Sequence, residues 1–263
     1  MRFSPKVVII CQARMGSTRL AGKVMLPLAG EPLLMRFLER VTMARHARNV
    51  IVATTTLERD DEIVDLCRIA GYQVYRGHPT DLVDRHFHAA REAEADVVVK
   101  IPTDCPLIDP MVIDMVIDEF LKHYPFVDYA SNLHPGSWPD GNDVEVMTML
   151  ALQRAWVSAR EPHEREHTTP WLWEKNPNIN SLNVLRPDGR QLEERHRWTI
   201  DHPEDYVLVR AVYDALYHGN PRFSCEQVLS FLEAHPEIDH VNQHLRGQGW
   251  YNSYLQSQSR IAS

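Results

Sequence analysis

The stretch KVVIICQARMGSTRLAGKV (residues 6–24) joins an apolar run to a loop with two glycines and three cations. The run KVVIIC is apolar after its lysine, which is the pattern of a buried strand. Gly16 permits unusual backbone dihedrals and a close approach to a ligand. Arg14, Arg19 and Lys23 add three positive charges with no acidic residue between them. The stretch therefore predicts a strand followed by an anion-binding loop.

This loop is close to the Walker phosphate-binding pattern but does not match it. The pattern requires GxxxxGK followed by serine or threonine. Here Gly16 and Gly22 enclose five residues, and Val24 stands where the magnesium-binding hydroxyl belongs. We therefore reject a P-loop nucleotidase and keep an anion-binding loop. The alternative is a solvated surface turn whose cations are incidental.

The first half of the chain alternates apolar segments with amphipathic ones. We expect strands at residues 6–11, 49–56, 73–77 and 96–101, and helices at 32–44, 59–72, 80–93 and 109–123. Thr80 or Asp81 is expected to cap the third helix. Repeated strand–helix units with continuously apolar strands imply a parallel sheet covered on both faces. Ligands of such sheets bind beyond the carboxyl ends of the strands, where ICQARMGSTR and IPTDCPLID lie.

The second half is less regular. We expect strands at 126–131, 143–147 and 195–201, and helices at 150–160, about 164–175 and 203–219. Between the first two strands, the loop at 132–142 is rich in turn formers. No linker, repeat or low-complexity tract divides the chain. We therefore expect one domain over residues 1–250, with an embellishment at about 132–195 and a polar tail at 251–263.

Length, net charge and composition limit the classes of protein to which this chain can belong. A chain of 263 residues can bury the core of one large domain. The formal net charge of -8 disfavours binding to nucleic acid or to an anionic membrane. The apolar run at residues 7–11 is too short to span a bilayer, and signal-peptide features are lacking. We expect a cytoplasmic protein whose four cysteines, which have no CxxC spacing, are reduced thiols.

The segment IICQARMGSTRLAGKV resembles the N-terminal signature of the cytidylyltransferase family, which includes the CMP-KDO and acylneuraminate synthetases. The sequence is most similar to the spore-coat polysaccharide SpsF-type branch. Further similar segments follow in order over residues 7–218: VIVATTT, DLVDRHFHAA, TDCPLIDP, PDGNDVEVM, EREHTTPW and RWTIDHPEDYVLVRAVY. The resemblance implies a three-layer α/β/α sandwich of the nucleotide-diphosphosugar transferase type, with a mixed, mainly parallel sheet. It also implies a homodimer formed through the irregular middle segment.

The resemblance implies Mg²⁺-dependent transfer of CMP from CTP to an acid oxygen of a sugar or related small acid, with release of pyrophosphate. The product would be a CMP-activated precursor for surface polysaccharide or glycan biosynthesis. An acceptor that is already ionised needs no strong general base, so the protein has to neutralise the triphosphate and align the acceptor. One alternative is a nucleotidyltransferase that uses another NTP, or a glycosyltransferase that uses a nucleotide sugar. Another is a non-catalytic nucleotide-binding subunit.

Compared residue by residue, the family pattern implies a nucleotide site and a metal site. Asp104 and Asp201, each expected at the end of a strand, resemble the metal aspartates, and Mg²⁺ prefers such oxygen ligands. Either residue would instead suit a helix cap. Lys23 and Arg14 are expected to act with them on the phosphates. The full nucleotide-binding set is Gln12, Ala13, Arg14, Gly16, Ser17, Arg19, Lys23, Asp84, Arg85 and Asp104.

Other candidate residues have weaker support from the sequence. Asp84 and Arg85 match a family pair near the nucleotide but would also suit the surface of an amphipathic helix. Asp143 and Glu145 share one face of a predicted strand by period-two alternation, toward an acceptor or toward water. The acceptor set is completed by Arg165 and His167, for which a dimer contact or ordinary packing is the alternative, and by Arg197, which could contact either the acceptor or a phosphate.

The chain departs from the usual pattern of the branch at three positions. Ala21 stands in place of proline, Thr103 in place of glycine and Asn142 in place of leucine. None of these changes removes a charged group that the chemistry needs. We therefore expect them to bear on the identity of the substrate more than on activity.

The run HEREH (residues 163–167) matches the HExxH pattern of zinc proteases. Pro162 and Pro170 bracket it and leave room for barely two helical turns. The similar family segment EREHTTPW accounts for the same residues without a metal. We therefore predict that this run does not bind zinc.

Overall fold

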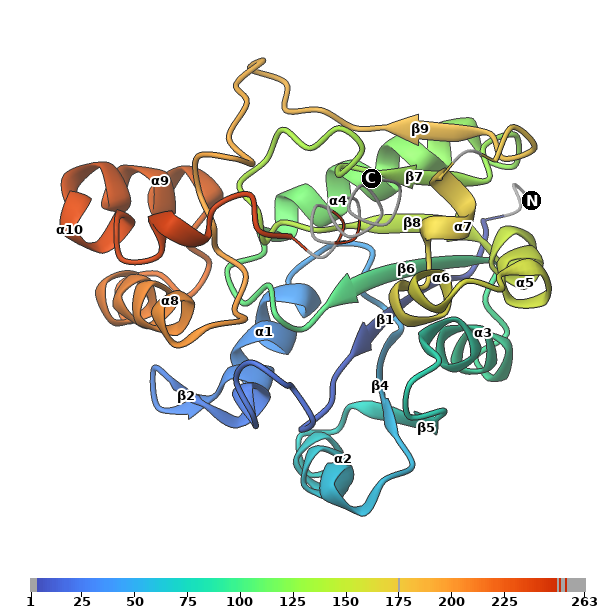
Figure 1. Cartoon of the computed structure of the whole chain (residues 1–263), viewed down its shortest axis with the longest axis horizontal. Helices are drawn as coiled ribbons and strands as arrows, with labels where there is room; N and C mark the ends of the chain where they lie inside the picture. Colours follow the sequence, from blue (N-terminus) through green and yellow to red (C-terminus); the bar gives the residue numbers. More distant parts are fainter. Residues whose placement is uncertain (1–3, 175, 250, 252–253, 255–263) are drawn as a thin grey trace, which may run out of the picture.

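Seven strands form one sheet in the order β5-β4-β1-β6-β8-β7-β9 (Figure 1). The structure is a computed structural model that describes residues 4–174, 176–249, 251 and 254. The strands are β1 (Val7–Gln12), β4 (Val50–Thr55), β5 (Gln73–Gly77), β6 (Val97–Pro102), β7 (Tyr129–Ser131), β8 (Glu145–Thr148) and β9 (Ser181–Asn183). β8 is antiparallel to β6 and β7, and the other pairs are parallel. The expected mixed, mainly parallel sheet is confirmed.

Helices cover both faces of this sheet. One face packs against α1 (Leu33–Thr42), α2 (Asp61–Ile69), α4 (Pro110–His123), α8 (Pro203–Leu216) and α9 (Cys225–Ala234). The other packs against α3 (Leu82–Glu92), α5 (Met149–Ser158) and α7 (Pro170–Trp173). Ile9 and Cys11 point into the first layer and Val8 and Ile10 into the second, as strand alternation requires. The three-layer α/β/α architecture is therefore confirmed.

Short elements complete the description. They are η1 (Lys23–Met25), β2 (Pro27–Leu28), β3 (Glu31–Pro32), η2 (Glu58–Asp60), α6 (Pro162–His167), α10 (Pro236–Asp239) and η3 (Gln243–Leu245). In Figure 1, α8, α9 and α10 gather at one end of the molecule, and α3, α5 and α6 lie at the other. The β1–η1 loop lies between these groups of helices, so the fold places it in reach of both halves of the chain.

The elements predicted in the first half agree with the structure to within a few residues. Every residue of β4 is buried, as its continuous apolar pattern indicates. Asp81 is the residue that caps α3, because its side chain accepts a hydrogen bond of 2.9 Å from the Asp84 N–H. All four cysteines are buried free thiols.

Two predictions in the second half were wrong. The helix expected at about 164–175 is two short helices, α6 and α7, because Thr168 adopts a φ of +74° and Pro170 opens a new helix. Position 175 lies outside the described residues. The segment 195–201 is not a strand and forms only an isolated bridge between Asp140 and Arg197. Asp201 therefore does not end a strand.

A buried ion pair explains the shape of this segment. The fully buried Arg197 donates from Nε to Oδ1 of Asp205 at 2.9 Å. Oδ2 of Asp205 accepts the N–H groups of Asp201 and His202, each at 2.9 Å. Asp205 thus caps the start of α8, which was one possible role of Asp201. Because the Arg197 side chain turns inward to Asp205, the backbone of residues 195–201 is arranged around this ion pair and does not form a strand of the sheet.

The last part of the chain was not assigned from its sequence. It folds as α9, α10 and η3, and Ser224 and Gln227 form a capping box at the start of α9. Of the tail expected at 251–263, the structure describes only Tyr251 and Tyr254, so the rest of that expectation lies outside the described residues.

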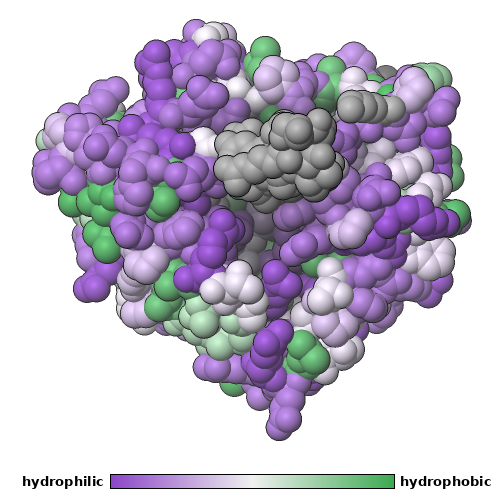
Figure 2. Space-filling model, viewed as in Figure 1, coloured by the Kyte–Doolittle hydropathy of each residue, from purple (hydrophilic) through white to green (hydrophobic). Residues whose placement is uncertain are grey.

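The surface is predominantly polar. Figure 2 shows hydrophilic residues over most of the visible face, with hydrophobic residues in small separate groups. Within the described residues, no helix combines the length and the apolar character needed to cross a bilayer.

We predict that Gly141→Ala destabilises the fold. Gly141 has a φ of +107°, and a Cβ there would lie 2.7 Å from the backbone N of Thr199. We expect a loss of about 3 kcal/mol in the free energy of unfolding, measured by urea denaturation. The matched control is Gly189→Ala, at a φ of +74° with no atom within 4 Å of the added Cβ, for which we expect about 1 kcal/mol. Equal losses in the two variants would contradict the steric explanation.

Candidate active site

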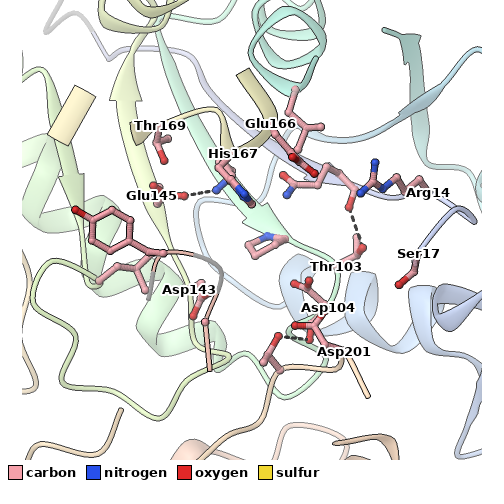
Figure 3. Close-up of a pocket in the computed structure, with 18 of the residues that line it drawn as sticks. Arg14, Ser17, Thr103, Asp104, Asp143, Glu145, Glu166, His167, Thr169 and Asp201 are labelled. Atoms are coloured by element: carbon pink, nitrogen blue, oxygen red, sulfur yellow. Dashed lines mark hydrogen bonds and ion pairs between the residues drawn. The ribbon is translucent and has the colours of Figure 1, made fainter. Parts of the chain in front are cut away.

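A cavity of about 450 Å³ opens beyond the carboxyl ends of β1 and β6. This is where ligands of open α/β sheets bind. Figure 3 shows side chains from the β1 loop, the end of β6 and the second half of the chain pointing into it. The predicted site residues that line it are Gln12, Ala13, Arg14, Ser17, Arg19, Lys23, Arg85, Asp104, Asp143, Glu145, His167, Arg197 and Asp201.

Lys23 lies between two carboxylates in this cavity. Its Nζ is 3.3 Å from Oδ2 of Asp104 and 3.0 Å from Oδ1 of Asp201, and it donates to the carbonyl of Ile200 at 2.6 Å. Burial alone would lower the pKa of Lys23, but Asp104 and Asp201 raise it above its ordinary value. Lys23 is therefore a fixed positive charge at neutral pH, held where the cavity meets the sheet.

Asp201 is contacted by two further cations. Nη2 of Arg19 lies 2.9 Å and Nη2 of Arg197 lies 3.3 Å from its Oδ2. Burial acts to raise the pKa of Asp201, but Lys23 and the two arginines together lower it. The carboxylate is thus ionised, and the cations around it leave this part of the cavity able to attract an anion.

The β1 loop is closed by its own backbone. The carbonyl of Met15 accepts the N–H groups of Ser17 at 2.9 Å and Gly22 at 3.0 Å. This turn directs Arg14, Ser17 and Arg19 into the cavity. Gly16 does not line the cavity, and a Cβ there would lie 2.6 Å from Nη2 of Arg59. Gly16 therefore lies beneath the exposed Arg59 side chain, whose flexible end could shift to admit a larger residue.

A buried polar cluster lines another part of the cavity. Lys100 of β6 and Glu145 of β8 are cross-strand partners, and their side chains form a short ion pair. Glu145 also accepts a hydrogen bond of 2.7 Å from the hydroxyl of Tyr129. Burial, followed by the charge of Lys100, lowers the pKa of His167 to about 3, so its imidazole is neutral at pH 7. His167 therefore brings no positive charge to this part of the cavity at neutral pH.

Asp140 and Asp143 form an acidic wall. Asp143 precedes β8 and so lies outside the strand that was expected to present it with Glu145. Both residues nevertheless line the cavity. Burial, followed by the charge of Asp104, raises the pKa of Asp143 to about 7. Burial, followed by the charge of Asp143, raises the pKa of Asp140 well above its ordinary value.

Besides Gly16, two predicted site residues, Asp84 and Arg165, lie outside the cavity lining, and both join helices to one another. Asp84 accepts a hydrogen bond of 2.9 Å from the indole of Trp156, which ties α3 to α5. Arg165 of α6 forms an ion pair with Asp81 at the start of α3. Arg85 does line the cavity, but its guanidinium donates to the backbone carbonyls of residues 78 and 79. These contacts hold the helices beside the site.

Sequence reasoning missed several residues that line the cavity. The clearest is Lys100, a charged residue within the apolar run DVVVKI whose partner, Glu145, had been singled out. A lone charge in a buried strand was the available signal, because such a charge needs a partner. Asp140 was also missed, since one sequence does not show that the loop before β8 turns back into the cavity.

Asp104 and Asp201 have the chemistry of a site for a hard divalent cation. Both carboxylates reach the same ammonium nitrogen, so the space between them accepts a positive charge. Two carboxylates together with substrate phosphates and water suit magnesium, which seldom takes all its ligands from protein. The described residues contain no group of three or more histidine, cysteine or acidic side chains arranged to hold a metal.

The residues of HEREH have other partners. Nε2 of His163 lies 2.9 Å from a carboxylate oxygen of Glu174. Glu164 accepts the N–H groups of Arg160 at 2.7 Å and Glu161 at 3.0 Å, as in a capping box. The glutamate that would serve as the base of a zinc protease thus caps α6.

The raised pKa of Asp143 predicts a pH-dependent stability. The folded protein holds this proton up to about pH 7, whereas the ordinary pKa is 3.8. The stabilising contribution of Asp143 is therefore complete at low pH and lost as pH rises through 7. Asparagine cannot ionise, so we expect the thermal midpoint of Asp143→Asn to rise relative to wild type between pH 5 and pH 8. A constant difference would contradict this, and Asp65→Asn, at an exposed position of α2, is the control.

Several known proteins are similar to this chain in sequence or in structure. A cytidylyltransferase from Leptospira borgpetersenii serovar Hardjo-bovis has a similar structure, with 31% identity and a TM-score of 0.85 over 90% of this chain and 97% of that one. The spore coat polysaccharide biosynthesis protein SpsF of Bacillus subtilis is 28% identical over 88% of this chain and 95% of its own length.

A third relative is the 3-deoxy-manno-octulosonate cytidylyltransferase of Chlorobaculum tepidum, which is 37% identical over 49% of this chain and 51% of its own length. The family model described as cytidylyltransferase matches residues 8–233, from β1 to the end region of α9. With the site at the carboxyl ends of β1 and β6, this match shows that the chain belongs to the cytidylyltransferase family and is a nucleotidyltransferase.

Proposed function

We propose that this enzyme transfers CMP from CTP to an acidic sugar or a related small acid, with Mg²⁺, and releases pyrophosphate. The observation that carries the proposal is the position of Lys23 between Asp104 and Asp201, with Arg14 and Arg19 beside it. The similarity to a spore coat polysaccharide protein and to an octulosonate cytidylyltransferase supports a role in making a precursor for surface polysaccharide.

The β1 loop is suited to a triphosphate. Arg14, Arg19 and Lys23 bring three positive charges to one side of the cavity, and the hydroxyl of Ser17 adds a donor. Arginine and lysine bind phosphate oxygens by charge-assisted hydrogen bonds, which are stronger than neutral ones. Lys23 and Arg19 now contact Asp201, so they are already placed to exchange this carboxylate for phosphate oxygens.

Asp104 and Asp201 would hold the magnesium ion once the phosphates draw these cations away. When bound by these two carboxylates, magnesium would supply positive charge that offsets the charge developing on pyrophosphate. The protein contributes the placement of both carboxylates. The backbone N–H of Ile200 donates to the carbonyl of Asp104 at 2.7 Å, which fixes the two aspartate-bearing segments side by side.

The transfer forms one bond and breaks one bond. An acceptor oxygen attacks the α-phosphorus of CTP, a new phosphorus–oxygen bond forms, and the bond to pyrophosphate breaks. The electron pair of the broken bond leaves with pyrophosphate, next to the positive charge of Lys23. An ionised acid oxygen brings no proton to this step. If the acceptor is a hydroxyl instead, Asp143 is the candidate general base, because its pKa lies near neutrality.

The acceptor is expected on the side of the cavity opposite the loop, where Glu145, His167 and Thr169 lie (Figure 3). Neutral His167 would contribute a hydrogen bond without a charge. Arg197 is engaged by Asp205 and Asp201, and Arg165 does not line the cavity. Recognition at this end therefore depends on hydrogen bonds more than on these two arginines.

Two alternatives change the substrates and keep the fold. Transfer from another NTP would also release pyrophosphate, whereas sugar transfer from a nucleotide sugar would release a nucleoside phosphate. A non-catalytic nucleotide-binding subunit would bind CTP without turnover. The paired carboxylates beside Lys23 favour catalysis, because binding alone does not require two partly buried acids next to a phosphate site.

We predict that Lys23→Met weakens the binding of CTP with Mg²⁺ by about tenfold or more, because one charge-assisted contact to phosphate is lost. The measurement is isothermal titration calorimetry. Lys122→Met is the matched control, since Lys122 is an exposed lysine of α4 that pairs with Glu119. An unchanged affinity in Lys23→Met, with both variants folded, would argue against a triphosphate at this loop.

Turnover gives a second prediction. With CTP, Mg²⁺ and a panel of octulosonic, nonulosonic and phosphonic acids, we expect one acceptor to cause release of pyrophosphate. We expect Asp201→Asn to lower that rate about a hundredfold or more, because electrostatic stabilisation of the transition state is lost. Asp214→Asn, at an exposed aspartate of α8, should keep the wild-type rate. Release of a nucleoside phosphate from a nucleotide sugar would instead identify a glycosyltransferase.

A further inference from the structure

The carboxylate of Asp60 is fully buried at the start of α2 and does not cap that helix. Aspartate at this position normally accepts a hydrogen bond from the N–H groups of the first helical turn. Here the side chain makes no such bond. A buried carboxylate that does not accept a capping hydrogen bond needs other partners, because an unpaired carboxylate is unfavourable to bury.

Its partners lie in the β1 loop and at the end of β4. Oδ1 of Asp60 accepts the N–H of Met15 at 2.7 Å, across 45 positions of the chain. Oδ2 accepts a short hydrogen bond from the hydroxyl of Thr55. The same hydroxyl oxygen accepts the N–H of Leu57 at 3.1 Å, which fixes the side chain of Thr55. Asp60 thus links β4 directly to the loop.

Met15 is the residue around which the loop turns. Its carbonyl accepts the N–H groups of Ser17 and Gly22, while Asp60 holds its N–H. All polar backbone atoms of Met15 are therefore engaged. The residues on either side of this fixed point include Arg14 and Ser17, which line the cavity. When the Met15 backbone is fixed, the directions of the Arg14 and Ser17 side chains are fixed as well.

Asp60 also moderates repulsion between two arginines. Burial, followed by the charge of Arg14, lowers the pKa of Arg85 to about 10, and Asp60 acts in the opposite direction. The buried carboxylate therefore lies within electrostatic reach of Arg85, which itself neighbours Arg14. Loss of the carboxylate would leave the positive charges of Arg14 and Arg85 with less compensation.

We propose that Asp60 is a positioning residue of this enzyme: it holds the Met15 peptide so that the β1 loop presents its cations to the triphosphate. The inference rests on the proposed function, in that it takes the loop to be the triphosphate site. Asp60 does not line the cavity, so it acts through Met15 and not by contact with the nucleotide.

Whether Asp60 keeps the β1 loop ordered can be tested without any nucleotide. Trypsin cleaves after Arg14, Arg19 and Lys23 once the loop opens, and mass spectrometry identifies the released N-terminal fragments. We expect Asp60→Ala to raise the initial rate of cleavage in the loop about tenfold, because the loss of a hydrogen bond to a charged group favours opening. Glu58→Gln is the matched control in the same turn, since Glu58 is exposed, and its rate should equal that of wild type.

A comparison of CTP with CMP tests the effect on the triphosphate. We expect Asp60→Ala to weaken CTP binding with Mg²⁺ about tenfold and CMP binding less than threefold, so that the ratio of the two affinities falls. General destabilisation would weaken both nucleotides alike. Asp60→Asn keeps an oxygen that accepts the Met15 N–H but loses the charge near Arg85, so we expect its affinity ratio to fall between those of wild type and Asp60→Ala.

Thr55→Val provides a second variant if Asp60→Ala does not fold. It removes the hydroxyl that orients Asp60 but leaves the carboxylate, and we expect about a threefold rise in loop cleavage. Unchanged loop cleavage in Asp60→Ala and Thr55→Val would overturn the proposal, as would equal losses in Asp60→Ala and Asp60→Asn. If wild type binds no CTP, the proposed function fails, while the cleavage rates still decide whether Asp60 holds the loop.

Discussion

The ammonium group of Lys23 between Asp104 and Asp201 is the interaction on which the site depends. It joins three segments of the chain, because Asp104 lies 81 residues and Asp201 lies 178 residues after Lys23. Each partner is partly or largely withdrawn from solvent, so removing one would leave the charge of another poorly compensated. Withdrawing three charged groups from water carries a desolvation penalty, so this arrangement is an unfavourable way merely to stabilise the fold. It is well suited to a reaction in which phosphates and a metal ion exchange partners with the same three groups.

The fold supplies each member of this group by a different route. Asp104 follows β6, so the sheet places it beyond the carboxyl end of a central strand. Lys23 follows a turn that is closed by the Met15 carbonyl and begins at the end of β1. Asp201 belongs to an irregular segment shaped by the buried pair of Arg197 and Asp205. Two parallel strands and one ion pair thus position the whole centre, and Asp60 adds a link from β4.

The sequence predicted the structure best where the local pattern of apolar residues agrees with their burial in the folded protein. Continuous apolar runs identified β1, β4 and β6, and the ends of β1 and β6 indicated where the loop that carries Lys23 and the residue Asp104 lie. The segment 195–201 was wrongly expected to be a strand, because Arg197 turns inward to an ion partner eight residues later. Long-range partners such as Lys100 with Glu145, or Asp60 with Met15, leave no signal in residue spacing. They emerge only once the register of the sheet and the path of the loops are known.

The measurement that tests the central claim most directly is calorimetric titration of CTP, UTP, ATP and GTP, each with Mg²⁺, into wild type and Asp104→Asn. The account predicts that CTP binds more tightly than the other three and that Asp104→Asn weakens this binding, because the metal loses one of its two carboxylates. Equal binding of all four triphosphates would contradict the assignment of the base. Absence of triphosphate binding, or an affinity that Asp104→Asn leaves unchanged, would contradict the assignment of the site.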